Sequence, residues 1–248
     1  GDNARAPYGT RTDDEVRTFS TEAIDALVER DVKAIVVACN TSSAVAIGDL
    51  RRRYALPILG VIRPGAVTAA LTTRNRRVGV IATPATIRSH AYFAAIKDEN
   101  PAVEVYEHAT PALVPMVESG QLSGPEVEAT VAEALAPLLG ARDAAGEFVF
   151  PLPPSARIDT LILGCTHYPL LAPTIRQILG PRVTLVDSAK QTAAEVRGLL
   201  MGTELLSQHR TTPRYRFFVT DESAQFNAIG QRFLGHVIGS VERVNGHR

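Results

Sequence analysis

The chain has 248 residues, which is enough for one large or two small α/β domains. Lys plus Arg and Asp plus Glu both number 26, so the formal net charge is zero with histidine neutral. This balance does not favour nucleic acid or an anionic membrane as a partner. No apolar run approaches the ~20 residues of a membrane span. The two cysteines are too few for a disulfide framework, so we expect a cytoplasmic protein with free thiols.

Hydrophobic periodicity predicts strands and helices in alternation along the chain. We expect strands at residues 32–38, 57–62, 78–82, 103–106, 158–164, 183–186, 214–219 and 236–244. We expect helices at residues 13–28, 41–53, 84–97, 112–118, 124–139, 169–179, 189–201 and 223–233, with one more starting at Pro64. Residues 1–9 are typical of a loop and residues 140–157 of a surface insertion. The alternation predicts a doubly wound α/β fold with mostly parallel sheets.

Both cysteines stand at the end of an apolar strand. Cys39 follows residues 32–38, Cys165 follows residues 158–164, and small polar residues come after each cysteine. The continuous apolar run before Cys39 is typical of a strand buried on both faces. Aligning the chain on the cysteines pairs the two strands, and a later strand with a polar tip follows each, ending at Thr83 and Ser188. This weak repeat predicts two pseudo-symmetric lobes that face each other across a cleft.

We place the first lobe at residues 1–66 plus 189–248 and the second at residues 67–188. Open parallel sheets bind ligands beyond the carboxyl ends of their strands, where both cysteines are expected. A helix is predicted after each cysteine, and its N-terminal N–H groups favour an anion, so we expect stabilised thiolates. The residues that follow offer a proton partner in His167 and donors for a carboxylate in Asn40, Thr41 and Thr166.

Two thiols in matching positions indicate a racemase. Inverting a carbon that bears hydrogen needs a base on one face and an acid on the other, and a thiolate and a thiol can exchange these roles. Taken alone, either cysteine is more often a small core residue, and His167 more often a structural hydrogen-bonding group. The residue spacings of a zinc site, a thioredoxin-type redox centre and a glycine-rich phosphate loop are absent.

Five stretches of the sequence, in the same order, resemble the glutamate racemases of the aspartate/glutamate racemase superfamily. They are Ala-Pro-Tyr-Gly at 6–9, Ala-Cys-Asn-Thr-Ser-Ser-Ala at 38–44, Val-Gly-Val-Ile-Ala-Thr-Pro-Ala-Thr at 78–86, Val-Pro-Met-Val-Glu-Ser-Gly at 114–120 and Leu-Gly-Cys-Thr-His-Tyr-Pro-Leu-Leu at 163–171. The resemblance covers residue 1 to about residue 196. It implies a homodimer that interconverts L- and D-glutamate without a cofactor or metal and supplies D-glutamate for peptidoglycan.

The resemblance also implies roles for individual residues. Cys39 would take the α-proton from D-glutamate and Cys165 from L-glutamate, and Glu118 and His167 match positions that assist the thiols. The residues implied to line the pocket are Pro7, Tyr8 and Gly9. The residues implied to bind the carboxylates and ammonium of the substrate are Asn40, Thr41, Thr83, Thr86 and Thr166.

One family feature is absent from the sequence. The family begins with a strand leading into an Asp-Ser-Gly-x-Gly-Gly loop, so we expect further sequence upstream of Gly1. Three alternatives stay open: an aspartate or hydantoin racemase of the same superfamily, a non-catalytic binding protein derived from a racemase, and a redox pair that forms a Cys39–Cys165 disulfide.

Overall fold

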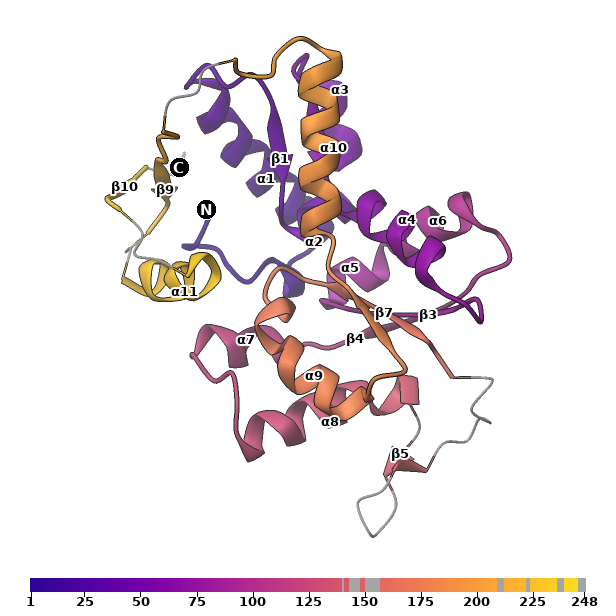
Figure 1. The fold of residues 1–248 in the computed structure, drawn as a ribbon. Helices are drawn as coiled ribbons and strands as arrows, with labels where there is room; N and C mark the ends of the chain where they lie inside the picture. Colours follow the sequence, from indigo (N-terminus) through magenta and orange to yellow (C-terminus); the bar gives the residue numbers. More distant parts are fainter. Residues whose placement is uncertain are drawn as a thin grey trace.

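The computed structural model describes residues 1–139, 141–142, 148–149, 157–208, 212–221, 224–235 and 239–244. Four parallel strands in the order β4-β3-β7-β8 form its largest sheet. Figure 1 shows this sheet in the lower half of the molecule. The bounds of its strands are β3 Arg77–Ala82, β4 Glu104–Ala109, β7 Thr160–Gly164 and β8 Thr184–Val186.

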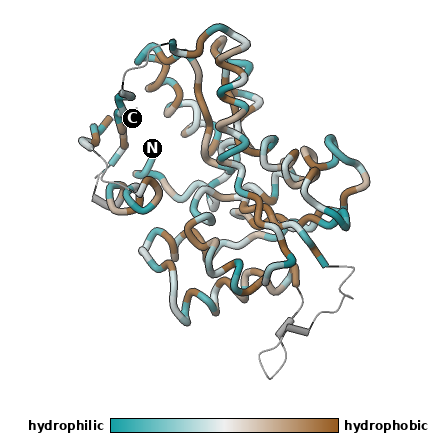
Figure 2. The backbone as a smooth tube through the Cα atoms, in the orientation of Figure 1, coloured by the Kyte–Doolittle hydropathy of each residue, from teal (hydrophilic) through white to brown (hydrophobic). Residues whose placement is uncertain are grey.

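Helices cover the four-stranded sheet on both faces. The apolar side chains form one cluster on each face. In the first cluster, Leu161 and Leu163 of β7 pack with α8 (Pro125–Leu139) and α9 (Ala172–Leu179). Ile162, the residue between them, packs with α4 (Ile62–Thr72) and α6 (Ala91–Glu99) in the other. Side chains that alternate between two covered faces explain why every residue of β7 is apolar or small and buried. In Figure 2 the hydrophobic backbone segments gather along these strands.

The strand that leads to Cys39 belongs to a separate parallel pair. It is β1 (Ile35–Val37), which pairs with β2 (Ile58–Gly60) and packs on α1 (Asp13–Val28) and α3 (Ile47–Arg53). Val36 is 41% exposed, so the prediction that this strand is buried on both faces is wrong. The side chain of Val36 faces a cavity instead of a covering element.

The C-terminal segment returns to the first pair of strands. α10 (Ala189–Gly202) packs against α4 and β2. Beyond it, β9 (Phe217–Val219) pairs in parallel with β10 (Val241–Arg243), and α11 (Ala224–Leu234) joins these two strands in sequence. Figure 1 shows β9, β10 and α11 beside the N-terminus, whereas α10 lies on the side of β1.

The predicted α/β architecture with parallel sheets is confirmed, and one part of the repeat is wrong. Thr83 and Ser188 follow β3 and β8, which flank β7 on its two sides. The two polar tips therefore belong to one sheet instead of one tip to each lobe. Buried strands share one apolar pattern, so the alignment could not tell which strands are neighbours. The division at residues 66 and 188 stays a prediction, and α4 runs through residues 66 and 67.

Three predicted helices are interrupted. Residues 41–53 form α2 (Asn40–Val45) and α3. Residues 84–97 form α5 (Pro84–Arg88) and α6, separated at His90, whose φ is 52°. Residues 169–179 begin as the 3₁₀ helix η3 (Tyr168–Leu171) before α9. The described residues also form the short helical segments η1 (Tyr8–Thr10) and α7 (Leu113–Glu118).

The predicted surface insertion at residues 140–157 lies mostly outside the described residues. Within it, β5 (Ala141–Arg142) and β6 (Phe148–Val149) form an antiparallel pair. Among the described helices, none combines the length and the apolar character that a membrane crossing requires.

Candidate active site

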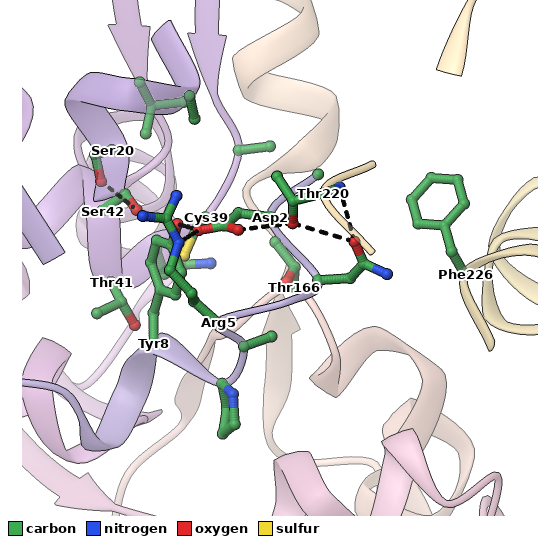
Figure 3. Close-up of a pocket in the computed structure, with 18 of the residues that line it drawn as sticks. Asp2, Arg5, Tyr8, Ser20, Cys39, Thr41, Ser42, Thr166, Thr220 and Phe226 are labelled. Atoms are coloured by element: carbon green, nitrogen blue, oxygen red, sulfur yellow. Dashed lines mark hydrogen bonds and ion pairs between the residues drawn. The ribbon is translucent and has the colours of Figure 1, made fainter. Parts of the chain in front are cut away.

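Both cysteines line one cavity of about 1300 Å³. It lies between the N-terminal loop, the carboxyl ends of β1 and β7, and the C-terminal segment (Figure 3). The predicted site residues on its wall are Pro7, Tyr8, Gly9, Cys39, Asn40, Thr41, Thr83, Glu118, Cys165, Thr166 and His167. The cavity thus brings together residues that follow strands of two separate sheets, Cys39 after β1 and Thr83 and Cys165 after the parallel neighbours β3 and β7.

Cys165 is the first member of a line of three groups. Its Sγ lies 3.6 Å from Nδ1 of His167, and Nε2 of His167 lies 2.5 Å from Oε1 of Glu118. His167 belongs to the turn after β7, and Glu118 is the last residue of α7. When Nε2 donates its proton to Glu118, the lone pair of Nδ1 is free to accept the thiol proton. In this arrangement the carboxylate can orient the ring and stabilise an imidazolium, as the acid of a catalytic triad does.

The expectation of a stabilised thiolate is wrong for Cys165. Its side chain is 7% exposed, and burial raises its pKa to about 12. This pKa also includes opposing smaller effects: hydrogen bonds from the His167 backbone and Thr166 lower it, and negative charge at Cys39 and Glu118 raises it. A turn and a short 3₁₀ helix follow Cys165 instead of the predicted α-helix, so a helix dipole does not offset the burial. Cys165 is therefore a thiol at neutral pH.

Cys39 occupies a different environment. It is the N-cap residue of α2 and is partly exposed to the cavity. Two hydroxyl contacts hold the helix in place: Ser43 donates to the carbonyl of Val37 at 2.7 Å, and Ser20 of α1 donates to Ser42 at 2.9 Å. The backbone that presents Cys39 is thus tied both to β1 and to α1.

Three threonine hydroxyls form a closed triangle beside Cys39. The Oγ1 atoms of Thr41 and Thr83 are 2.9 Å apart, those of Thr41 and Thr86 3.2 Å, and those of Thr83 and Thr86 3.0 Å. Thr41 and Thr83 line the cavity, but Thr86 is fully buried behind them. The structure therefore separates Thr86 from the other predicted substrate-binding residues. Its contacts orient the two hydroxyls that do reach the cavity.

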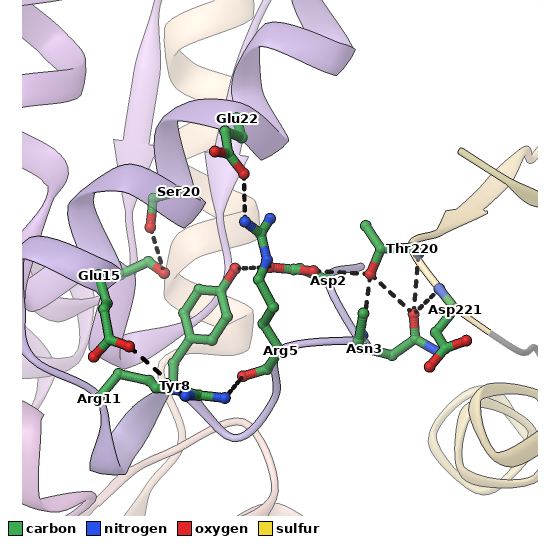
Figure 4. Close-up of polar contacts among 12 residues, drawn as sticks. Asp2, Asn3, Arg5, Tyr8, Arg11, Glu15, Ser20, Glu22, Thr220 and Asp221 are labelled. Atoms are coloured by element: carbon green, nitrogen blue, oxygen red, sulfur yellow. Dashed lines mark hydrogen bonds and ion pairs between the residues drawn. The ribbon is translucent and has the colours of Figure 1, made fainter. Parts of the chain in front are cut away.

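The N-terminal loop carries groups that sequence reasoning missed. The Asp2 side chain is only 5% exposed, and its carboxylate accepts hydrogen bonds from Arg5 Nε at 2.7 Å, Tyr8 at 2.5 Å and Thr220 at 2.8 Å (Figure 4). Arg5 also pairs with Glu22 of α1. Burial and the Asp2 charge raise the pKa of Tyr8 far above its ordinary value, so its phenol stays protonated. Asp2 and Arg5 are three residues apart in a segment that we read only as a loop.

The C-terminal segment also contributes to the cavity wall. Its lining residues include Phe218, Thr220, Asp221, Phe226, Ile229 and Phe233. These residues follow the last segment that resembles the racemase family, so no motif marked them. Both cysteines are free thiols, so the structure does not form the Cys39–Cys165 disulfide of the redox alternative. Among the described residues, no three His, Cys, Asp or Glu side chains gather as they would around a metal ion.

Comparison with known proteins agrees with this geometry. Residues 1–196 match the Asp/Glu/Hydantoin racemase family. The chain belongs to this family of racemases. It is 43% identical to the glutamate racemase of Shouchella clausii, over 99% of the chain and 83% of the relative. It is 45% identical to that of Neisseria meningitidis serogroup A, over 99% of the chain and 85% of the relative.

Solved structures of the same family share the fold of this racemase. Glutamate racemase isoform RacE1 from Bacillus anthracis has a TM-score of 0.88 and 38% identity, over 99% of this chain and 86% of its own. Glutamate racemase from Francisella tularensis, in complex with D-glutamate, has a TM-score of 0.85 and 36% identity, with the same two coverages. The resemblance and the fold class that the sequence predicts are therefore both confirmed.

Proposed function

We propose that this protein interconverts L- and D-glutamate without a cofactor, with Cys39 and Cys165 as the acid/base pair. The observation that carries the proposal is the presence of both free thiols on the wall of one cavity, each followed by polar groups that suit a charged amino acid. A carbon held between two thiols can lose a proton to one and gain a proton from the other.

In the D-to-L direction, Cys39 as a thiolate removes the α-proton. Cys165 gives its thiol proton to the opposite face of the carbanion, which suits a residue that is protonated at neutral pH. The product leaves Cys39 protonated and Cys165 as a thiolate. In the L-to-D direction the roles reverse, and His167 takes the proton of Cys165 before Cys165 acts as the base, with Glu118 stabilising the imidazolium.

The α-proton of an amino acid is weakly acidic, so the site must stabilise the developing negative charge. The side chains of Asn40, Thr41, Thr83 and Thr166 supply donors around the cavity, and Pro7, Tyr8 and Gly9 also line it, with Gly9 packed against Thr83. Fixed donors of this kind act most strongly in a site of low dielectric constant. Asn40, Thr41 and Thr83 are nearly buried, so solvent does not compete for them.

The substrate is glutamate and not aspartate or a hydantoin. The support for this choice is that relatives named glutamate racemase are 43–45% identical to this chain over 99% of its length. The exchange of the α-hydrogen in deuterated water tests it directly, with no cofactor added, on the complete protein as its host makes it. Both glutamate enantiomers should exchange, and Cys39→Ala or Cys165→Ala should abolish racemisation. Faster exchange of aspartate or a hydantoin, or full activity in either variant, would reject the proposal.

The cellular setting follows from the reaction. D-glutamate is a building block of peptidoglycan, and we expect the protein to supply it in the cytoplasm as a homodimer of two-lobed subunits. Restored growth of a bacterium that requires D-glutamate would support the cell-wall role. Sedimentation of the purified protein should give twice the mass of one chain, and a monomer at all concentrations would contradict the dimer.

A further inference from the structure

A fully buried tyrosine lies between the neighbours of the two cysteines. Tyr92, on α6, is 0% exposed, and its hydroxyl donates a 2.7 Å hydrogen bond to Oδ1 of Asn40, the residue after Cys39. On the other side, a Cβ placed on Gly164, the residue before Cys165, would lie 3.1 Å from Cε2 of Tyr92. One aromatic ring therefore packs beside the strand that ends in Cys165 and holds the side chain that follows Cys39.

The hydrogen bond decides which way the Asn40 amide faces. A tyrosine hydroxyl has a single proton, and among the described residues Asn40 Oδ1 is the acceptor that the buried hydroxyl reaches. Burial, followed by negative charge at Cys165 and Asp187, raises the pKa of Tyr92 far above its ordinary value, so this donor is not lost. Because the oxygen is turned toward Tyr92, the NH₂ group is the end of the Asn40 amide that faces away from Tyr92 and is free to donate into the cavity that Asn40 lines.

The opposite orientation of the amide would be unfavourable twice over. It would leave the Tyr92 hydroxyl buried without its acceptor, which costs more than an ordinary hydrogen bond contributes. It would also turn the amide oxygen toward any carboxylate in the cavity, where two acceptors repel each other. Tyr92 therefore makes Asn40 a donor, as recognition of an anionic group requires.

We propose that Tyr92 is a positioning residue that fixes the Asn40 amide so that its NH₂ group binds the α-carboxylate of the substrate. This inference rests on the proposed function, because the α-carboxylate is one bond from the carbon that Cys39 must reach. Tyr92 also links the two halves of the site, since α6 packs on the four-stranded sheet and contacts α2, which carries Asn40.

Tyr92→Phe tests the proposal, because it keeps the ring against Gly164 and removes only the hydroxyl. We expect KM to rise about tenfold for both enantiomers, the effect of losing one oriented hydrogen bond, while kcat changes less than about threefold. Asn40→Ala should raise KM at least as much. The double variant should be no worse than Asn40→Ala alone, because the hydroxyl acts through Asn40.

Tyr54→Phe is the matched control. It removes a hydroxyl that donates to Asp25 Oδ1 at 2.5 Å outside the cavity, so KM should not change. An unchanged KM in Tyr92→Phe with only a lower melting temperature would overturn the proposal, as would additive effects in the double variant. Absence of racemisation by the unaltered protein would instead refute the proposed function, and this inference with it, before any variant is compared.

Discussion

Replacing Glu118 by Gln tests the proton path beside Cys165. The substitution keeps an acceptor near His167 Nε2 and removes the negative charge. A hydrogen bond to a charged group contributes roughly 1.5–3 kcal/mol, and each ~1.4 kcal/mol is a tenfold change in rate. The side chains of His167 and Glu118 are 22% and 33% exposed, so solvent screens part of this energy. We therefore expect kcat/KM to fall about 10- to 30-fold, near the lower limit of that range.

The isotope effect tells which thiol is affected. The two enantiomers have equal free energy in water, so kcat/KM must fall equally in both directions and cannot locate the defect. If Glu118 acts through His167 on Cys165, proton transfer at Cys165 becomes the slower of the two transfers. The isotope effect on kcat/KM should then rise for α-deuterated L-glutamate and shrink toward unity for α-deuterated D-glutamate.

Circular dichroism of racemisation by protiated and deuterated substrates measures both quantities. Glu126→Gln provides the control, because Glu126 is an exposed residue in the first turn of α8 and does not line the cavity. An unchanged kcat/KM in Glu118→Gln would refute the role of the carboxylate. An isotope effect that rises for D-glutamate instead would assign Glu118 to the Cys39 side and refute the line of contacts as the proton path.

Three further outcomes are expected. At neutral pH a thiol-alkylating reagent should modify Cys39 well before Cys165, which is 7% exposed, and peptide mass spectrometry measures the order; equal rates would contradict the burial. Gly9→Ala would place a methyl group 2.4 Å from Cβ of Thr83, so we expect a loss of about 1–3 kcal/mol in stability by thermal denaturation, together with a higher KM; an unchanged melting temperature would show that the loop has room. The free energy of unfolding should fall as pH rises from 9.0 toward 12, because the pKa of Cys165 is about 12 in the folded state and 9.0 in the unfolded state. The stabilisation that comes from this difference is complete only below the unfolded pKa and is lost as pH rises through the folded pKa. Denaturant titrations should find a shallower fall in Cys165→Ala, and equal slopes would refute the assignment.

The part of the site that the sequence predicts is the part that local patterns encode. An apolar run that ends in a small polar residue marks the carboxyl end of a strand. This pattern located Cys39 and Cys165 at two strand ends, which the structure places on the wall of one cavity. The residues after Cys165 already indicated His167, and the resemblance added Glu118. These two residues are separated by 49 positions, and no local pattern reports their contact. The position at which a strand ends is thus predictable from the local sequence, whereas a contact between side chains of different elements is known only from the tertiary structure.

The features that the sequence did not predict depend on what covers each element. Val36 has the same apolar character as the residues of β7, but its face of β1 borders the cavity. Thr86 occurs in the same motif as Thr83 and is buried one turn behind it, because Thr83 is the N-cap of α5 and Thr86 lies inside the helix. Asp2 accepts a hydrogen bond from Thr220, which is more than two hundred residues away in the sequence, so no local pattern could mark it.

The difference between the two thiols is the main change from the symmetric site that the repeat suggested. Cys39 is partly exposed at the start of a helix, whereas Cys165 is buried and has its own imidazole and carboxylate. A racemase nevertheless must run both directions with the same kcat/KM. Burial keeps Cys165 protonated and ready to donate, so its return to a base needs a proton acceptor within reach. In the proposed mechanism His167 is that acceptor, because its ring lies 3.6 Å from the sulfur of Cys165 and is held on its other side by Glu118.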